Sequence, residues 1–213
     1  MNPNRPIAWK PNRTRQTSTL YFGRGVDHEF YLRGAVCWPF YSQRDNKVRG
    51  YAILAGMKVG DRKIHVFEEM EFFEIDSIIN EHEAIHGFAH MVGIAWAHYG
   101  CKRWFDRIDS DPKWRDRVRR ADQVEPRPFF QDVTVEAGAY QDFVLRYIQS
   151  SHIEYLASGG IHNSLEEMRQ TEGRSYADYP ELMATGLLLA GLEEWPFRHA
   201  DQPHDFPIAP RAW

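Results

Sequence analysis

The first third of the chain alternates short hydrophobic runs with polar turns, a pattern that predicts strands before any helix. Aromatic and β-branched residues, which favour strands, are concentrated in these runs. A Gly60-Asp61-Arg62 connection is typical of a β-hairpin between the last two runs. We therefore expect an antiparallel group of strands over Thr19–Asp27, Phe30–Tyr41, Val48–Val59 and Lys63–Phe73.

The hydrophobic spacing then changes to one that predicts a long, mostly buried helix. Asp76 or Ser77 is a suitable N-cap and Gly100 a suitable stop, so the helix should run to about Tyr99. The later elements are expected as a strand over Lys102–Ile108, a helix over Gly138–Ser150, a strand over His152–Leu156, and helices over Ser164–Thr171 and Tyr179–Trp195. This order predicts an α/β fold with a mixed β-sheet and helices on both faces.

The composition suits one large domain, because 43% of the 213 residues are hydrophobic. A formal net charge of -4 gives no basic surplus, so any contact with nucleic acid must come from local clusters. The two cysteines lack the spacing of a metal site. No run reaches the ~18 apolar residues of a membrane span, so we expect no membrane partner. We expect the domain over residues 18–196, a flexible leader over 1–17 and an irregular tail over 197–213.

Acidic residues stand at three joints of this predicted order. Asp27 closes a strand, Asp106 follows the long helix, and Asp178 opens the last helix. Carboxylates at the ends of adjacent strands and on a covering helix can converge on two divalent cations that clamp a phosphodiester. The alternative is that each aspartate caps a helix or turns a loop.

Five stretches carry a resemblance to the nuclease domain of viral large terminases: GRGVD at residues 23–27, RGYAILAG and KIHVFEE in the following strands, WFDRID at 104–109, and ADYPELMATGLLLAGLEE at 177–194. The resemblance implies an RNase H-like fold and a metal-dependent endonuclease that cuts concatemeric viral DNA during genome packaging. It implies Mg²⁺ or Mn²⁺ as cofactor and double-stranded DNA as substrate. It also implies an ATPase motor and a portal or procapsid as partners, in the cytoplasm of the infected host cell.

The same resemblance places the acids of the site, with their substitutes, at Asp27, at Asp106 or Asp109, and at Asp178 or Glu181. His28-Glu29-Phe30 follows the first acid where the family has a glycine-rich turn, so Glu29 is a rival for that role. No GxxxxGK[ST] sequence is present, which predicts an isolated nuclease domain or half of a split protein. A further alternative is a catalytically inactive assembly module of a packaging machine.

A basic run is the candidate for contacts with the DNA backbone, because phosphate neutralisation requires only cations along one face. Its members are Arg103, Arg107, Lys113, Arg115, Arg117, Arg119 and Arg120. The alternative is a solvated segment balanced by the nearby aspartates, of the kind that charge runs usually form.

The predicted long helix contains His82-Glu83-Ala84-Ile85-His86, which matches the pattern of zinc hydrolases. Two histidines four residues apart share a helix face and can hold Zn²⁺, while Glu83 would act as the base. His90 lies about 12 Å along the helix from His82, too far to share one ion, so Glu154 is the candidate third ligand. The alternative is a histidine-lined helix face that packs beside the sheet or a partner.

Overall fold

The computed structural model describes residues 5–42, 45–60, 63–76, 80–107, 110–121, 124–134, 144, 153–171, 173–174 and 178–194. The strands are β1 (Ala8–Asn12), β2 (Thr17–Phe22), β3 (Val26–Tyr41), β4 (Lys47–Lys58), β5 (Ile64–Asp76), β6 (Arg103–Arg107), β7 (Phe129–Val133) and β8 (Ile153–Glu154). The helices are α1 (Glu81–Tyr99), α2 (Pro112–Arg120), α4 (Gly160–Gln170) and α5 (Pro180–Glu194), and a short 3-10 turn spans Gly23–Gly25. No helix among these residues is long and apolar enough to cross a membrane.

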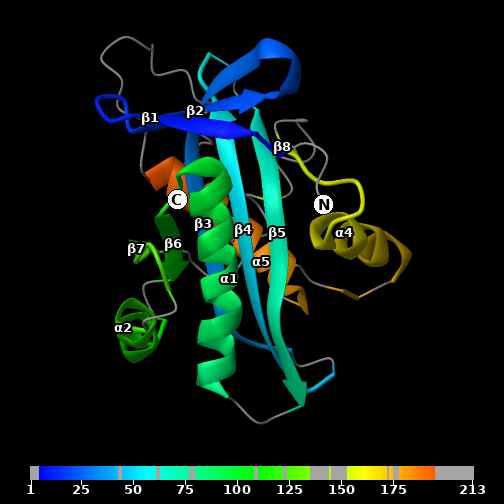
Figure 1. Ribbon diagram of the computed structural model, residues 1–213. Helices are drawn as coiled ribbons and strands as arrows, with labels where there is room; N and C mark the ends of the chain where they lie inside the picture. Colours follow the sequence, from blue (N-terminus) through cyan, green and yellow to red (C-terminus); the bar gives the residue numbers. More distant parts are fainter. Residues whose placement is uncertain are drawn as a thin grey trace.

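The described strands form one mixed sheet around the long strand β3 (Figure 1). β3, β4 and β5 are an antiparallel meander, whereas β6 runs parallel to β3 and β7 runs parallel to β6. The β1–β2 hairpin pairs with the first residues of β3, and β8 pairs with the start of β5.

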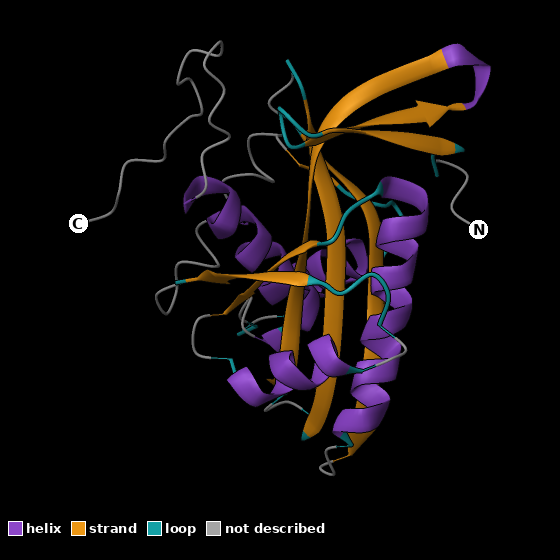
Figure 2. Cartoon of the chain, turned by 60° about the vertical axis from the view of Figure 1, so that its left-hand side comes forward, coloured by secondary structure: helices purple, strands orange, loops and turns teal. Residues whose placement is uncertain are grey.

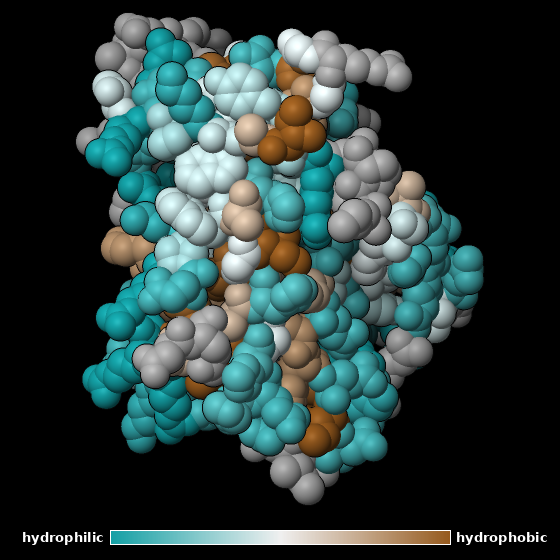
Figure 3. Space-filling view, viewed as in Figure 1, coloured by the Kyte–Doolittle hydropathy of each residue, from teal (hydrophilic) through white to brown (hydrophobic). Residues whose placement is uncertain are grey.

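Helices cover both faces of the sheet, as predicted (Figures 1 and 2). Alternate residues of a strand point to opposite faces, and β3 follows this rule closely. Val36 and Trp38 pack with α1 and α2, whereas Ala35 and Cys37 pack with α4 and α5. The α1 side of the molecule presents mainly hydrophilic residues to solvent, with hydrophobic ones in small areas between them (Figure 3).

α1 begins later than the sequence predicts. β5 continues to Asp76, Ser77 lies outside the described residues, and the N-cap is Asn80. The Asn80 side chain accepts hydrogen bonds from the backbone N–H groups of His82 and Glu83, which satisfies two donors that a helix start leaves free. The predicted stop is correct, since Gly100 closes the helix with a φ of 68°.

The N-terminal segment differs from the expected leader over residues 1–17, because Ala8–Asn12 form a strand that pairs with β2. Trp9 fixes this hairpin to α1: its ring lies 5.0 Å from that of Trp96, and its Nε1 donates to the Ala97 carbonyl. A proline-containing polar segment therefore joins the sheet by backbone pairing with β2, and the Trp9–Trp96 contact fastens it to α1. The expected tail over 197–213 lies outside the described residues, as does the expected helix over 138–150 apart from Val144.

Candidate functional site

Asp27 and Asp106 are far apart, so the structure does not bring the predicted acidic triad into one metal site. Ala35 of β3 pairs with Phe105 of β6, which places Asp106 level with Val36. Asp27 lies nine residues earlier on the same strand, a separation of roughly 30 Å at about 3.3 Å per residue. Two cooperating metal ions lie only about 4 Å apart.

The first acid and its rival belong to the hairpin end of β3. Asp27 is exposed and lies opposite Tyr21 of β2. The Glu29 carboxylate accepts hydrogen bonds from Asn12 and Thr17, and Arg15 lies 3.6 Å away. Glu29 therefore links β3 to the β1–β2 hairpin, a role that stabilises the fold.

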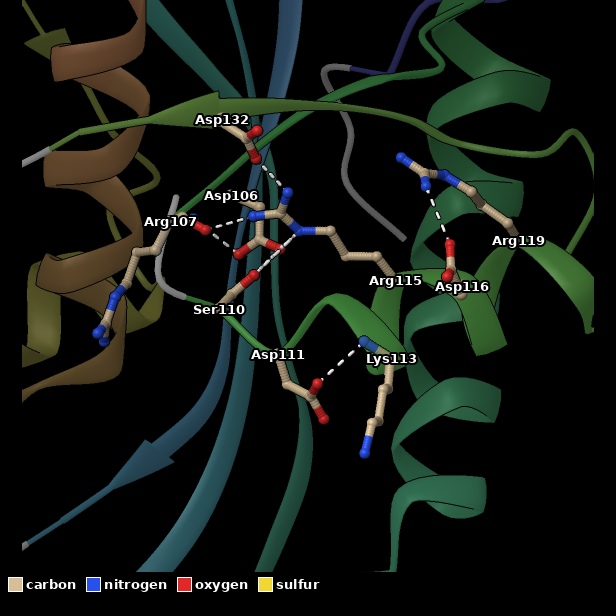
Figure 4. Close-up of polar contacts among 9 residues, drawn as sticks. All are labelled: Asp106, Arg107, Ser110, Asp111, Lys113, Arg115, Asp116, Arg119 and Asp132. Carbon is tan, nitrogen blue, oxygen red and sulfur yellow. Dashed lines mark hydrogen bonds and ion pairs between the residues drawn. The ribbon is translucent and has the colours of Figure 1, made fainter.

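Asp106 is the centre of a buried polar network on the α2 side of the sheet (Figure 4). Its carboxylate accepts hydrogen bonds from the Arg115 Nε at 2.6 Å, the Ser110 hydroxyl at 2.7 Å and the Arg107 backbone N–H at 2.8 Å. Burial raises the pKa of Asp106, while Arg115 and Ser110 oppose the rise. Arg115 also donates to Asp132 and to the Arg107 carbonyl. The network fastens α2 to β6 and β7, and Asp106 has no oxygen left without a donor.

The basic run divides into one internal cation and several surface ones. Arg115 is buried within the Asp106 network and is therefore not the DNA contact that the sequence suggests. Arg107 extends to the opposite side of β6 from Arg115 (Figure 4). Arg103 donates to Gln16, Arg117 pairs with Glu81, and Arg119 pairs with Asp116 at 3.3 Å. Lys113, Arg117, Arg119 and Arg120 are exposed on α2.

A pocket of about 760 Å³ lies on the other face of the sheet, between β4, β5, α4 and α5. We call it the carboxylate pocket, because five of its lining residues are acidic. The lining residues are Asp45, Arg49, Tyr51, Glu69, Glu71, Leu156, Ser158, Gly159, Gly160, Asn163, Ser164, Glu167, Tyr179 and Glu181. Of the predicted site residues only Glu181 lies here. Asp178, one turn earlier, is half-buried and does not line the pocket, and Asp109 lies outside the described residues.

Two carboxylates of the pocket each keep one oxygen without a donor among the described residues. Glu69 Oε2 accepts from the Tyr51 hydroxyl at 2.8 Å and from the Ile161 backbone N–H at 3.0 Å, but its buried Oε1 accepts nothing. Oε2 of Glu181 is likewise buried and without a donor. Burial raises the pKa of both groups, and the charge of Glu69 adds to the rise at Glu181. An unpaired buried carboxylate oxygen is costly unless a ligand completes it.

Glu71 and Arg49 complete the electrostatics of the pocket. Burial, together with the charge of Glu74, raises the pKa of Glu71 to about 7. The Arg49 guanidinium holds Asp45 at 2.6 Å and approaches Glu71 at 3.5 Å and Glu74 at 3.3 Å. Arg49 is the only cation among the described lining residues, so negative charge exceeds positive charge in the pocket.

The donor set of the pocket fits a hard cation. Two buried oxygens for which the described residues offer no donor belong to carboxylates, and carboxylate oxygens are ligands that hard cations prefer. No three His, Cys, Asp or Glu side chains of the described part of the chain stand close enough for one ion. Mg²⁺ is often bound by one or two carboxylates, with waters and substrate phosphates as its other ligands, so Glu69 and Glu181 are the candidate ligands of such a site.

Sequence reasoning missed Glu69 and Glu71. The signal is visible in KIHVFEEMEFF, where acidic residues interrupt a run that otherwise reads as a buried strand. Glu69 is half-buried and Glu71 lines the pocket with an exposed side chain. Charged residues are uncommon in core strands, so their presence in this run is itself informative. The sequence does not show which helix faces them, because that depends on how α4 and α5 pack.

Glu154, the expected third ligand of the alternative zinc site, lies far from His82 and His86. His82 and His86 are exposed at the start of α1, with their Nε2 atoms 3.0 Å apart. Glu154 pairs with His65 near the opposite end of β5, where it also binds Lys63 at 3.0 Å. β5 separates the two places by roughly 35 Å, so Glu154 does not join the histidines.

Comparisons of this chain with protein-family models and with curated proteins find no match.

Proposed function

We propose that the chain is a Mg²⁺- or Mn²⁺-dependent DNA endonuclease of the terminase type, with its cation held in the carboxylate pocket by Glu69 and Glu181. The observation that carries the proposal is a pair of buried oxygens, one from a sheet strand and one from a covering helix, for which the described residues supply no donor. A divalent cation would satisfy both oxygens and offset their repulsion. The mixed sheet with helices on both faces and the resemblance in sequence order also support it.

Glu69 and Glu181 would hold the cation, which would supply Lewis acidity and lower the pKa of a coordinated water. Within the chain, Tyr51 and the Ile161 backbone N–H hold one oxygen of Glu69, which leaves the other free as a ligand. Arg49 is placed to limit repulsion between Glu71 and Glu74. These residues orient the ligands and do not themselves react.

Contact with DNA needs cations outside the pocket, because the pocket itself is acidic. α2 carries exposed basic residues, but it packs on the opposite face of the sheet from the pocket. A duplex that touches both would have to pass around an edge of the sheet. Such contacts neutralise phosphates without reading sequence, which agrees with an endonuclease of low specificity. The ATPase motor and the portal or procapsid remain the proposed partners, and the cytoplasm of an infected cell the proposed location.

The test is plasmid cleavage by the purified chain with Mg²⁺, Mn²⁺, Zn²⁺ or EDTA. We expect nicking with Mn²⁺ or Mg²⁺ that disappears in a Glu69→Gln/Glu181→Gln double variant. Glu166→Gln, on the surface of α4, is the matched control and should cut normally. Asp27→Asn should also cut normally. Cleavage that survives the double variant but is lost in Asp27→Asn would refute the assignment of the pocket.

One observation favours a second candidate, the inactive assembly module. Between Phe30 and Tyr41 the central strand β3 carries no acidic residue, so no carboxylate on it faces Glu181 or Asp106. A packaging protein that acts only through its fold would need no carboxylate on this strand. Intact DNA under every metal condition, with normal folding of the chain, would favour this candidate.

A further inference from the structure

The histidine pair at the start of α1 remains as a separate feature after the zinc hydrolase is set aside. His82 and His86 lie one turn apart on the solvent side of the helix, and both rings are exposed. Their ring centroids are 4.5 Å apart, and the ring planes are nearly perpendicular at 84°. The two Nε2 atoms converge to 3.0 Å, so at least one of them presents its lone pair to the other.

The distance between the two Nε2 atoms favours one coordination geometry. With metal–nitrogen bonds of about 2.0–2.1 Å, nitrogens 3.0 Å apart subtend an angle of roughly 90–100° at the metal. That angle is closer to adjacent ligands of a tetragonal ion than to the tetrahedral angle of structural zinc. Tetragonal nitrogen sites are typical of Cu²⁺ and Ni²⁺, and Cu²⁺ also leads the affinity order of divalent first-row metals.

We propose that His82 and His86 form a two-histidine surface site for a tetragonal transition-metal ion, Cu²⁺ before Ni²⁺, with water as the remaining ligands. The Asn80 cap holds the first turn in helical form, so both imidazoles are presented on one face before the metal arrives. Glu81 is paired with Arg117 on α2, which leaves the imidazoles as the ligands of the site. The site is distinct from the carboxylate pocket in place and in ligand chemistry, since one offers nitrogen and the other oxygen.

The test is calorimetric titration of the full chain with CuCl₂, NiCl₂, ZnCl₂ and MgCl₂. Wild type should bind one more Cu²⁺ than His82→Gln or His86→Gln, with Cu²⁺ tighter than Ni²⁺ or Zn²⁺ and no Mg²⁺ uptake at this site. His98→Gln, near the other end of α1, is the matched control and should titrate like wild type. Equal Cu²⁺ binding by all four proteins would overturn the proposal.

Two further measurements keep the outcome clear. Electron paramagnetic resonance of the wild-type protein with one equivalent of Cu²⁺ should show hyperfine coupling to two imidazole nitrogens, and a spectrum without nitrogen coupling would refute the site. Glu181→Gln should retain the Cu²⁺ site while it loses any Mn²⁺-dependent cleavage. Failure of the nuclease proposal would therefore leave this result unchanged.

Discussion

Burial raises the pKa of both Asp106 and Glu181, yet the surroundings of the two carboxylates differ. Asp106 accepts three hydrogen bonds. One of them comes from Arg115, which also donates to residues of β6 and β7. Glu181 keeps a buried oxygen that accepts no hydrogen bond from the described residues. A carboxylate with every donor supplied stabilises the fold, whereas one with a buried vacant oxygen is a candidate ligand. Burial alone does not separate the two.

The largest expected effect tests whether the Asp106–Arg115 network stabilises the fold. Arg115→Met would leave Asp106 buried and uncompensated, so the free energy of unfolding should fall by about 3–5 kcal/mol. Urea denaturation followed by tryptophan fluorescence measures this, since Trp114 lies in the adjacent core. Arg119→Met on the exposed side of α2 is the control, with a change of about 0.5 kcal/mol or less. Equal stability of the two variants would show that the network does not stabilise the fold.

A smaller effect tests how tightly the carboxylate pocket is built. A Cβ on Gly159 would lie 1.5 Å from Oε1 of Glu69, so Gly159→Ala must displace that carboxylate. We expect a loss of about 1–3 kcal/mol of stability, as for other overpacked sites. Any rise in the unfolding temperature on addition of Mn²⁺ should disappear as well.

The matched control for this change is Gly93→Ala. Gly93 lies within α1, and a Cβ there would meet no atom within 4 Å. Alanine should therefore stabilise the protein by roughly 0.5–1 kcal/mol through helix propensity. A Gly159→Ala variant that gains stability like this control, and keeps its Mn²⁺ response, would contradict the described position of Glu69.

Local patterns predict much of the fold. Short hydrophobic runs rich in aromatic and β-branched residues predict the meander β3–β4–β5, and the apolar run ending at Gly100 predicts α1 and its stop. The start of α1 could not be placed to the residue, because Asp76, Ser77 and Asn80 all carry side chains that can cap. β1 was missed because its polar, proline-containing sequence lacks the hydrophobic residues that mark the other strands, although it pairs with β2 along its length.

The site is less predictable, for a physical reason. Which carboxylates meet depends on register and on the face to which each side chain points. Asp106 and Arg107 are neighbours in sequence but point to opposite sides of β6, and Asp27 is separated from both by the length of β3. Only Glu181, named as a substitute, lies in the pocket. A sequence pattern fixes strand identity, whereas tertiary packing decides which side chains share a cavity.

The smallest expected effect concerns pH, and it sharpens the comparison from the side of the carboxylate pocket. Burial and the charge of Glu74 raise the pKa of Glu71 to about 7 in the folded chain, above its ordinary value near 4.5. The folded state therefore binds this proton more tightly than the unfolded state does. The associated stability is fully present below the ordinary pKa and is lost as the pH rises towards and through 7.

In metal-free buffer the unfolding temperature of wild type should fall between pH 5 and pH 8 by more than that of Glu71→Gln, in which this titration is absent. Glu166→Gln, outside the pocket, should follow wild type. Scanning calorimetry in EDTA measures the three curves. Mn²⁺ should reduce the fall in wild type, because a cation in the pocket favours the charged form of the carboxylates. Parallel curves for wild type and Glu71→Gln would show that Glu71 is solvated like an ordinary surface acid, and the pocket would then lose one of the charges that make it attractive to a cation.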